Sequence, residues 1–331
     1  MTRTFTRVKE HKPTNGHLPL SLLYNNLSFI EDCELLVYAS RKDGVLMNTE
    51  THVVRLLPTG SNEREFIKHI TAIRAPPGML HPENTIVVLL TTASSTELWT
   101  VESPLGFIPH DGSNGSGCCG ALSAAFGDSV HVVVGTSKGV VVFATFDHHS
   151  NTPLSVHSAV KGHEEHAVTA VQLSPFSNSD IYAATGDAVG CLLLWNRERQ
   201  PFVSLKTSEC ITALQIVSDG DFVVAANGAG KLQMFDSRSG EMRLEICAHS
   251  RWINVLAFNP VANVLLSAAE DGYCTVWSAP VKSTSGATPI TVLATHHIPH
   301  ALPTGAGFNK DGSQVVIGLY DSDTMTQYTL T

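Results

Sequence analysis

Three adjacent segments in the second half of the chain share one pattern of apolar and polar positions. Each has an alternating apolar stretch, a polar link, a second apolar stretch, a glycine-containing turn and a third stretch that ends in an aromatic residue. The segments span 167–195, 210–235 and 252–277, and their final aromatics recur after 40 (235 − 195) and 42 (277 − 235) residues. Alternation is typical of half-buried strands, and this period is typical of β-propeller blades.

Weaker copies of the pattern lie at 34–47, 70–99, 120–143 and 304–328, which gives seven units. Seven blades of roughly 40–45 residues need about 280–315 residues, and they nearly exhaust the 331 residues of the chain. We therefore predict an all-β fold, a seven-bladed propeller with four-stranded antiparallel blades, in a single domain over residues 1–331. The predicted units are 24–60, 66–105, 118–148, 160–206, 207–246, 247–280 and 291–331.

The predicted ring needs a closing strand, because an open sheet edge invites pairing with other chains. Residues 4–8 are strand-like, and the last unit ends with the chain, so we predict that this N-terminal strand forms the outer edge of the seventh blade. Segments rich in Gly, Ser, Pro and His at 110–120, 146–158 and 280–290 are predicted as surface loops. Residues 62–69 have the composition of about two helical turns.

The unit from 249 to 277 contains four side chains that can form one buried hydrogen-bond network. His249 precedes the first strand, Ser267 lies in the second, Asp271 lies in the turn, and Trp277 ends the third. A buried imidazole can bond to both a carboxylate and a hydroxyl, and that hydroxyl can accept from an indole N–H. This spacing resembles the structural tetrad of the WD-repeat family. The resemblance implies a non-enzymatic seven-bladed propeller that acts through protein contacts.

The unit at 162–195 keeps Gly162, His163 and Trp195, but Asp187 stands two residues away from the expected turn position. We therefore predict that its network is incomplete. A catalytic Ser-His-Asp triad is disfavoured for the tetrad residues, because no nucleophile elbow or oxyanion-hole motif accompanies them.

Charge and composition disfavour nucleic acid and the membrane interior as binding partners. The chain has 21 basic and 30 acidic residues, and only 15% of its residues are charged. Residues 81–331 alone hold 11 basic and 22 acidic groups, and this acidic body disfavours nucleic-acid binding. The longest aliphatic run, 86–90, is far shorter than a membrane span. Seven irregularly spaced cysteines and the lack of a signal peptide favour the cytoplasm, with vesicle or cilium association left open.

No segment carries a convincing cofactor or metal motif. The HEEH stretch at 163–166 places its histidines three apart, whereas the helical zinc motif needs four. The NGAGK stretch at 227–231 lacks the first glycine and the Ser or Thr of a phosphate loop. We predict no catalytic residue, no cofactor and no metal site.

The candidate partner-binding residues are Arg251, Trp252, Glu270 and His166, which the WD-repeat resemblance places on the top face of the ring. Tryptophan and arginine are enriched in binding hot spots; the alternative is that Trp252 packs under a neighbouring loop. We predict a non-catalytic scaffold that presents these residues to a protein or peptide partner. An architectural subunit with ring-edge contacts, a metal-dependent propeller enzyme and self-association stay open as alternatives.

Overall fold

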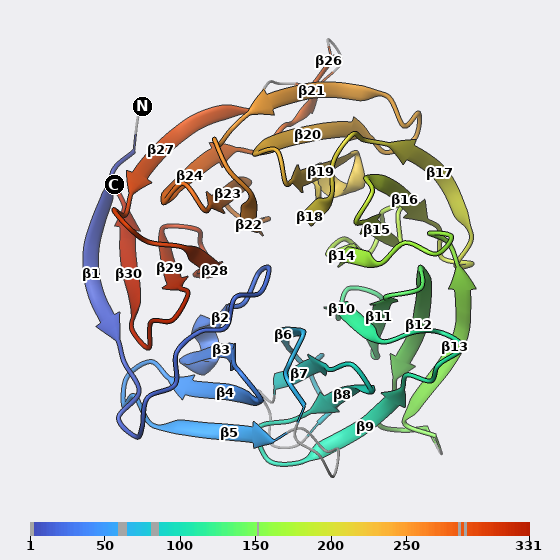
Figure 1. Cartoon of the computed structure of the whole chain (residues 1–331), viewed down its shortest axis with the longest axis horizontal. Coiled ribbons are helices and arrows are strands. Elements are labelled where there is room, and N and C mark those ends of the chain that lie inside the picture. The colour runs from blue at the N-terminus through green and yellow to red at the C-terminus, as the bar shows by residue number, and fades with distance from the viewer. Residues whose placement is uncertain (1–2, 59–64, 81–85, 151, 284–285, 288–289) are drawn as a thin grey trace.

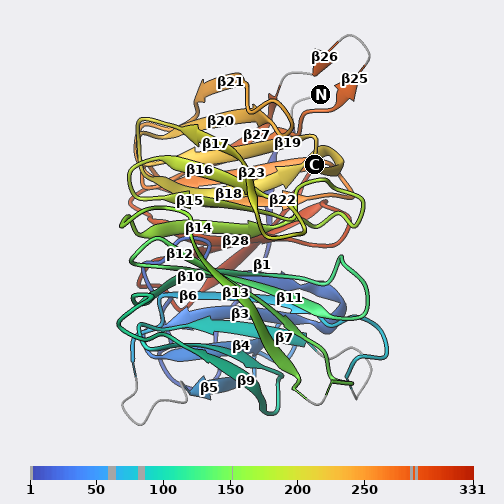
Figure 2. The ribbon, with the colours of Figure 1, turned by 90° about the vertical axis from the view of Figure 1, so that its right-hand side faces the viewer.

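The computed structural model describes residues 3–331 apart from 59–64, 81–85, 151, 284–285 and 288–289. Within these residues, seven four-stranded antiparallel sheets stand around a central axis and close into a ring (Figure 1). We number these sheets blades 1 to 7. The predicted fold, an all-β propeller of seven four-stranded blades, is confirmed. The same ring is seen from its side in Figure 2.

In blades 1 to 6 the strand that comes first in the chain is innermost and the last is outermost, whereas in blade 7 the N-terminal strand is outermost (Figure 1). Blade 1 contains β2 (Ser28–Ile30), β3 (Leu35–Ser40), β4 (Asp43–Asn48) and β5 (Val54–Pro58); blade 2 contains β6 (His69–Arg74), β7 (Ile86–Thr91), β8 (Ser95–Trp99) and β9 (Pro104–Pro109); blade 3 contains β10 (Gly117–Ser123), β11 (Val130–Thr136), β12 (Val140–Phe146) and β13 (Leu154–Lys161). Blade 4 contains β14 (Val168–Leu173), β15 (Ala183–Asp187), β16 (Cys191–Trp195) and β17 (Pro201–Lys206); blade 5 contains β18 (Ile211–Val217), β19 (Phe222–Asn227), β20 (Lys231–Asp236) and β21 (Met242–Cys247).

Blade 6 contains β22 (Ile253–Asn259), β23 (Val264–Ala269), β24 (Tyr273–Ser278) and β27 (Thr291–His297); blade 7 contains β28 (Pro303–Phe308), β29 (Gln314–Leu319), β30 (Met325–Leu330) and β1 (Phe5–His11). A small hairpin of β25 (Lys282–Ser283) and β26 (Gly286–Ala287) projects outward from blade 6 (Figures 1 and 2). Two single-turn 3₁₀ helices, η1 (Glu31–Cys33) and η2 (Ser218–Gly220), complete the described elements. No helix in the described part of the chain is both long and apolar enough to cross a membrane.

The middle strands form the core because each blade is covered on both faces by its neighbours. All six residues of β7, of β19 and of β23 are buried, whereas β17 and β21 alternate between exposed and half-buried positions. A strand buried on both faces has no place for an unpaired charge. This packing explains why so few residues of the chain are charged.

The ring closes as predicted, by a strand from the N-terminus. β1 pairs antiparallel with β30, from Phe5 opposite Leu330 to His11 opposite Met325, so the closing strand is longer than the predicted 4–8. Its first residues also contact blade 6. The ring of Phe5 stacks on that of His296 with centroids 5.3 Å apart, and the amide of Arg3 donates to the carbonyl of Leu293 at 2.6 Å.

Three local predictions are wrong. Residues 154–158 of the predicted loop 146–158 belong to the outer strand β13, and residues 117–120 of the predicted loop 110–120 belong to β10. The outer strand β13 faces solvent and therefore carries polar residues that resemble a loop. The inner strand β10 is buried, and its start resembles a loop because of its glycines at 117 and 120. Of the predicted helix at 62–69, residues 62–64 lie outside the described part; 65–68 are not helical, and His69 begins β6.

The segment before β2 enters the central channel (Figure 1). We call residues 20–27 the plug. Asn25 fastens it across the channel to blade 6, because its amide donates to the carbonyl of Asn254 at 3.0 Å and its Oδ1 accepts from the amide of Leu256 at 2.9 Å. The buried side chain of Asn26 donates to the carbonyl of Ala39 at 3.0 Å and accepts from the Ala39 amide at 2.7 Å. The plug therefore bridges blades 1 and 6.

Candidate functional site

The predicted tetrad residues of blade 6 form one continuous network. Nδ1 of His249 lies 3.2 Å from Oδ1 of Asp271, and Nε2 lies 2.7 Å from Oγ of Ser267. The indole of Trp277 donates to the same Oγ at 2.9 Å. The carboxylate of Asp271 can only accept, so the proton of the imidazole is assigned to Nδ1 of His249. The Ser267 oxygen accepts from the indole and its hydroxyl then donates to the unprotonated Nε2.

Burial sets the protonation of this network. It lowers the pKa of His249, against the opposing effect of Asp271, so the imidazole stays neutral. Partial burial alone would raise the pKa of Asp271, but the amides of Ser250 and Tyr273 and the imidazole of His249 hold it below its usual range. The network ties the loop before β22 to the turn before β24, and it holds both on one face of the ring, which we call the top face.

Blade 4 has a second complete network, which contradicts the prediction that it is incomplete. Nδ1 of His163 lies 3.0 Å from Oδ2 of Asp187, and Nε2 lies 2.7 Å from Oγ1 of Thr185. The indole of Trp195 donates to Thr185 at 2.8 Å. Asp187 stands two positions earlier than Asp271 does relative to the turn glycine, but its carboxylate still reaches the imidazole. Sequence spacing alone does not reveal the Asp187–His163 bond, because whether the carboxylate reaches the imidazole depends on the backbone conformation of the turn.

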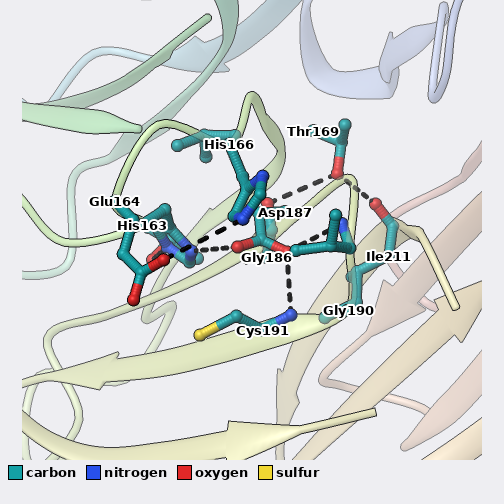
Figure 3. A network of polar contacts seen from close by, with 12 residues as sticks. His163, Glu164, His166, Thr169, Gly186, Asp187, Gly190, Cys191 and Ile211 are labelled. Carbon is teal, nitrogen blue, oxygen red and sulfur yellow. Dashed lines mark hydrogen bonds and ion pairs between the residues drawn. The ribbon is translucent and has the colours of Figure 1, made fainter. Parts of the chain in front are cut away.

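The blade 4 network also brings together three side chains that could ligate a metal. Ligand atoms of His163, Asp187 and Cys191 all lie within 4.8 Å of one another. Both nitrogens of His163 already have partners, and Oδ1 of Asp187 accepts from the amides of Val189 at 3.0 Å and Cys191 at 2.8 Å (Figure 3). Burial raises the pKa of the Cys191 thiol and keeps it protonated. These bonds support a structural role for the cluster.

Three of the four candidate partner-binding residues lie together on blade 6. Arg251 and Trp252 precede β22, and the amide of Glu270 donates to the carbonyl of Trp252 at 3.0 Å. The Trp252 side chain stays 40% exposed, although its indole covers Gly228 of blade 5 so closely that a Cβ there would lie 3.0 Å from the ring. The tryptophan therefore both packs on a neighbouring turn and presents part of its ring to solvent.

His166 is not part of that group. It lies before β14 in blade 4, its Nε2 is 4.0 Å from a carboxylate oxygen of Glu164, and blade 5 separates it from Trp252 (Figures 1 and 3). Its half-buried ring is held by the His163 loop, because the amide of His166 donates to the carbonyl of His163 at 2.9 Å.

A cavity of about 640 Å³ opens beside the plug at the mouth of the channel. Glu270, the exposed Lys68 and the half-buried Tyr24 are among the residues that line it. Burial raises the pKa of Tyr24 to about 12, and Cys210 and Glu270 add to the shift, so its hydroxyl stays protonated and can donate. Tyr24 and Lys68 lie outside the repeated strands, so the repeat pattern does not mark them as candidate site residues. The polar YNN stretch at 24–26, between apolar residues, is the one signal that marks the plug.

Comparisons with known proteins agree with this architecture. A family model described as WDR54 matches residues 107–329. "WD repeat domain 54" of Rattus norvegicus is 24% identical over 244 residues, which cover 71% of this chain and 72% of the relative. "WD repeat-containing protein 54" of Mus musculus is 24% identical over 243 residues, with the same two coverages.

A solved structure described as "Crystal Structure of Mitotic Checkpoint Complex" contains a chain of the same fold. It superposes with a TM-score of 0.75 over 98% of this chain and 96% of that chain. The identity between the two sequences is 13%, so this similarity supports the propeller fold alone.

Proposed function

Because the chain belongs to the WDR54 family, we propose that it is a non-catalytic scaffold whose top face binds a protein or peptide partner. WD-repeat propellers generally serve as protein-interaction scaffolds. The observation that carries the proposal is the arrangement on blade 6, where a 40%-exposed tryptophan, an exposed arginine and a carboxylate lie on loops held by a buried network. Rigid loops lose little conformational entropy when a partner docks.

The cavity beside the plug extends this surface toward the channel axis. Glu270 belongs to both, since it bonds to the backbone of Trp252 and lines the cavity. A partner segment that lies over Trp252 could therefore continue past Glu270 toward Tyr24 and Lys68. These residues supply an anion, a hydroxyl donor and a cation for its polar groups.

An architectural role through the ring edge is the second candidate. It is favoured by apolar side chains that are exposed on the outer strands of five blades: Phe107 (68%), Val156 (52%), Phe202 (42%), Met242 (50%) and Val292 (52%). Large exposed apolar surfaces often mark interaction sites. These side chains lie on β9, β13, β17, β21 and β27, so a partner would meet them from outside the ring.

One experiment separates the two surfaces. Proximity labelling in cells compares the unmodified chain with the double variant Arg251→Ala/Trp252→Ala and with Phe202→Ala, whose side chain is as exposed as that of Trp252. The top-face proposal expects the blade 6 variant to lose specific neighbours while Phe202→Ala keeps them. The reverse pattern favours the ring edge. Matched melting temperatures ensure that lost contacts do not reflect unfolding.

A further inference from the structure

Two histidines lie ring against ring where the closing strand of blade 7 meets blade 1. His11 ends β1 and is 1% exposed, and His52 lies half-buried in the turn between β4 and β5. Their ring centroids are 5.6 Å apart, and the two ring planes make an angle of 74°. Among the described residues, neither the buried Nδ1 of His11 nor the buried Nε2 of His52 has a hydrogen-bond partner. Buried nitrogens without partners are costly, so a ligand from outside the chain that binds both would stabilise this junction.

The proton of His11 is held on its other nitrogen, Nε2. This atom lies 2.7 Å from Oε1 of Gln327, and Nε2 of Gln327 donates to Oε1 of Gln314 at 2.6 Å. The oxygen of Gln327 therefore faces the imidazole and accepts its proton, so we assign that proton to Nε2 of His11 and a free lone pair to Nδ1. Histidines that bind metals characteristically donate their second N–H to a neighbouring oxygen in this way.

The turn that carries His52 is held by hydrogen bonds on both sides. Its amide donates to the carbonyl of Asn48 at 2.9 Å, and its carbonyl accepts from the amide of Thr14 at 3.1 Å and from the Thr14 hydroxyl at 3.0 Å. The φ of His52 is 59°, in the left-handed region. Strained backbone of this kind is concentrated at ligand-binding and other functional sites. The segment that follows β1 therefore fixes the position of the second histidine.

The surroundings keep His11 neutral, as a metal ligand must be. Burial lowers the pKa of His11; its bond to Gln327 opposes this effect, and Lys9 and the second imidazole add to it. Lys9 would also repel a metal ion, but its ammonium donates to the carbonyl of Thr49 at 2.8 Å and pairs with Glu50 at 3.1 Å. The carboxylate of Glu50 therefore offsets the positive charge near the two histidines.

We propose that His11 and His52 form a binding site for a zinc ion between blades 7 and 1. Imidazole nitrogen is a preferred ligand of zinc, and a bound ion would satisfy both nitrogens that the chain leaves unpaired. Zinc takes four ligands, so water fills the positions that two imidazoles leave open. The ion would join the closing strand to the turn of blade 1, which gives the ring a metal-dependent clasp. This site goes beyond the proposed scaffold function.

Calorimetric titration of the metal-free whole chain with Zn²⁺ tests this site. The unmodified chain should bind zinc, and zinc should raise its melting temperature, because a ligand of the folded state stabilises that state. His52→Asn should weaken zinc binding at least tenfold and leave the metal-free melting temperature nearly unchanged, since asparagine tolerates a positive φ. The matched control is His148→Asn/His149→Asn, an exposed pair with ring centroids 5.9 Å apart, and it should keep the affinity.

Two further measurements identify the ligands. Cys191→Ser alters the cluster of blade 4 that could also ligate a metal, and it should leave zinc affinity unchanged. Nitrogen-15 NMR of the unmodified chain should show zinc shifting the resonances of Nδ1 of His11 and Nε2 of His52. The proposal is overturned if the chain binds no zinc, as expected when a water molecule bridges the two nitrogens. It is also overturned if Cys191→Ser or the control pair loses affinity in place of His52→Asn, or if other histidine nitrogens shift instead.

Discussion

Nδ1 of His163 lies 3.0 Å from Oδ2 of Asp187, even though this aspartate stands two residues earlier in its turn than Asp271 does in blade 6. The two blades thus reach the same network from different sequence positions. In blade 4, Asp187 also accepts from two amides of the turn, so one carboxylate orients the imidazole and shapes the turn.

Replacing Asp187 should therefore weaken blade 4 strongly. Asp187→Ala leaves the buried Nδ1 of His163 without an acceptor, and we expect the free energy of unfolding to fall by about 1–3 kcal/mol. Urea unfolding measures the change. The double variant Asp187→Ala/Val189→Asp has a carboxylate directly before Gly190, as Asp271 stands before Gly272. It should recover part of the lost free energy of unfolding. An unchanged midpoint for Asp187→Ala would contradict the assigned network.

Acidification should destabilise the ring. Burial lowers the pKa values of His163 and His249 below the usual value near 6.5, so the unfolded chain binds protons before the folded chain does. Stability is then complete above pH 6.5 and declines as the pH falls toward the folded-state values. The decline is at most about 1.4 kcal/mol per pH unit for each histidine. Thermal melting between pH 8 and pH 5 measures it, and a melting temperature that rises on acidification would refute this assignment.

Deleting residues 3–11 should open the ring at blade 7. The deletion exposes the edge of β30 and removes the contact of Phe5 with His296, so the melting temperature should fall and the chain should self-associate through the free edge. Size-exclusion chromatography with calorimetry reports both effects. The milder Phe5→Ala keeps the backbone pairing, and we expect it to lower stability while the chain stays monomeric.

The plug should depend on the buried amide of Asn26. Asn26→Ala removes the acceptor for the amide of Ala39 and the donor to its carbonyl, so we expect a loss of about 1–3 kcal/mol. Asn26→Asp keeps an acceptor for the Ala39 amide, but its second oxygen would face the carbonyls of Ser21 and Ala39, so it should be at least as harmful. Hydrogen exchange at Leu256, whose amide bonds to Asn25, should quicken in both variants. If its protection is unchanged, the plug does not depend on Asn26.

The repeated strands made the fold predictable, because turn glycines and final aromatics recur wherever a blade keeps its pattern. The four residues of the blade 6 network were predictable for the same reason. Asp187 was misjudged because hydrogen-bond reach depends on backbone conformation within the turn. Residues 154–158 were misjudged because an outer strand need not be apolar. Tyr24 and Lys68 line one cavity although they lie on distant segments, and no local pattern encodes that contact.

The β1–β30 ladder also determines how the ring responds to force. Phe5 faces Leu330 at one end of this ladder, and His11 faces Met325 at the other. A pull on the two chain ends therefore loads the Phe5 end first and separates the pairs one after another, as a zipper opens, instead of shearing all of them together. β1 therefore stabilises the closed ring against thermal unfolding, but it is also the first strand to separate under tension. The other six blades come under load only after β1 has separated from β30.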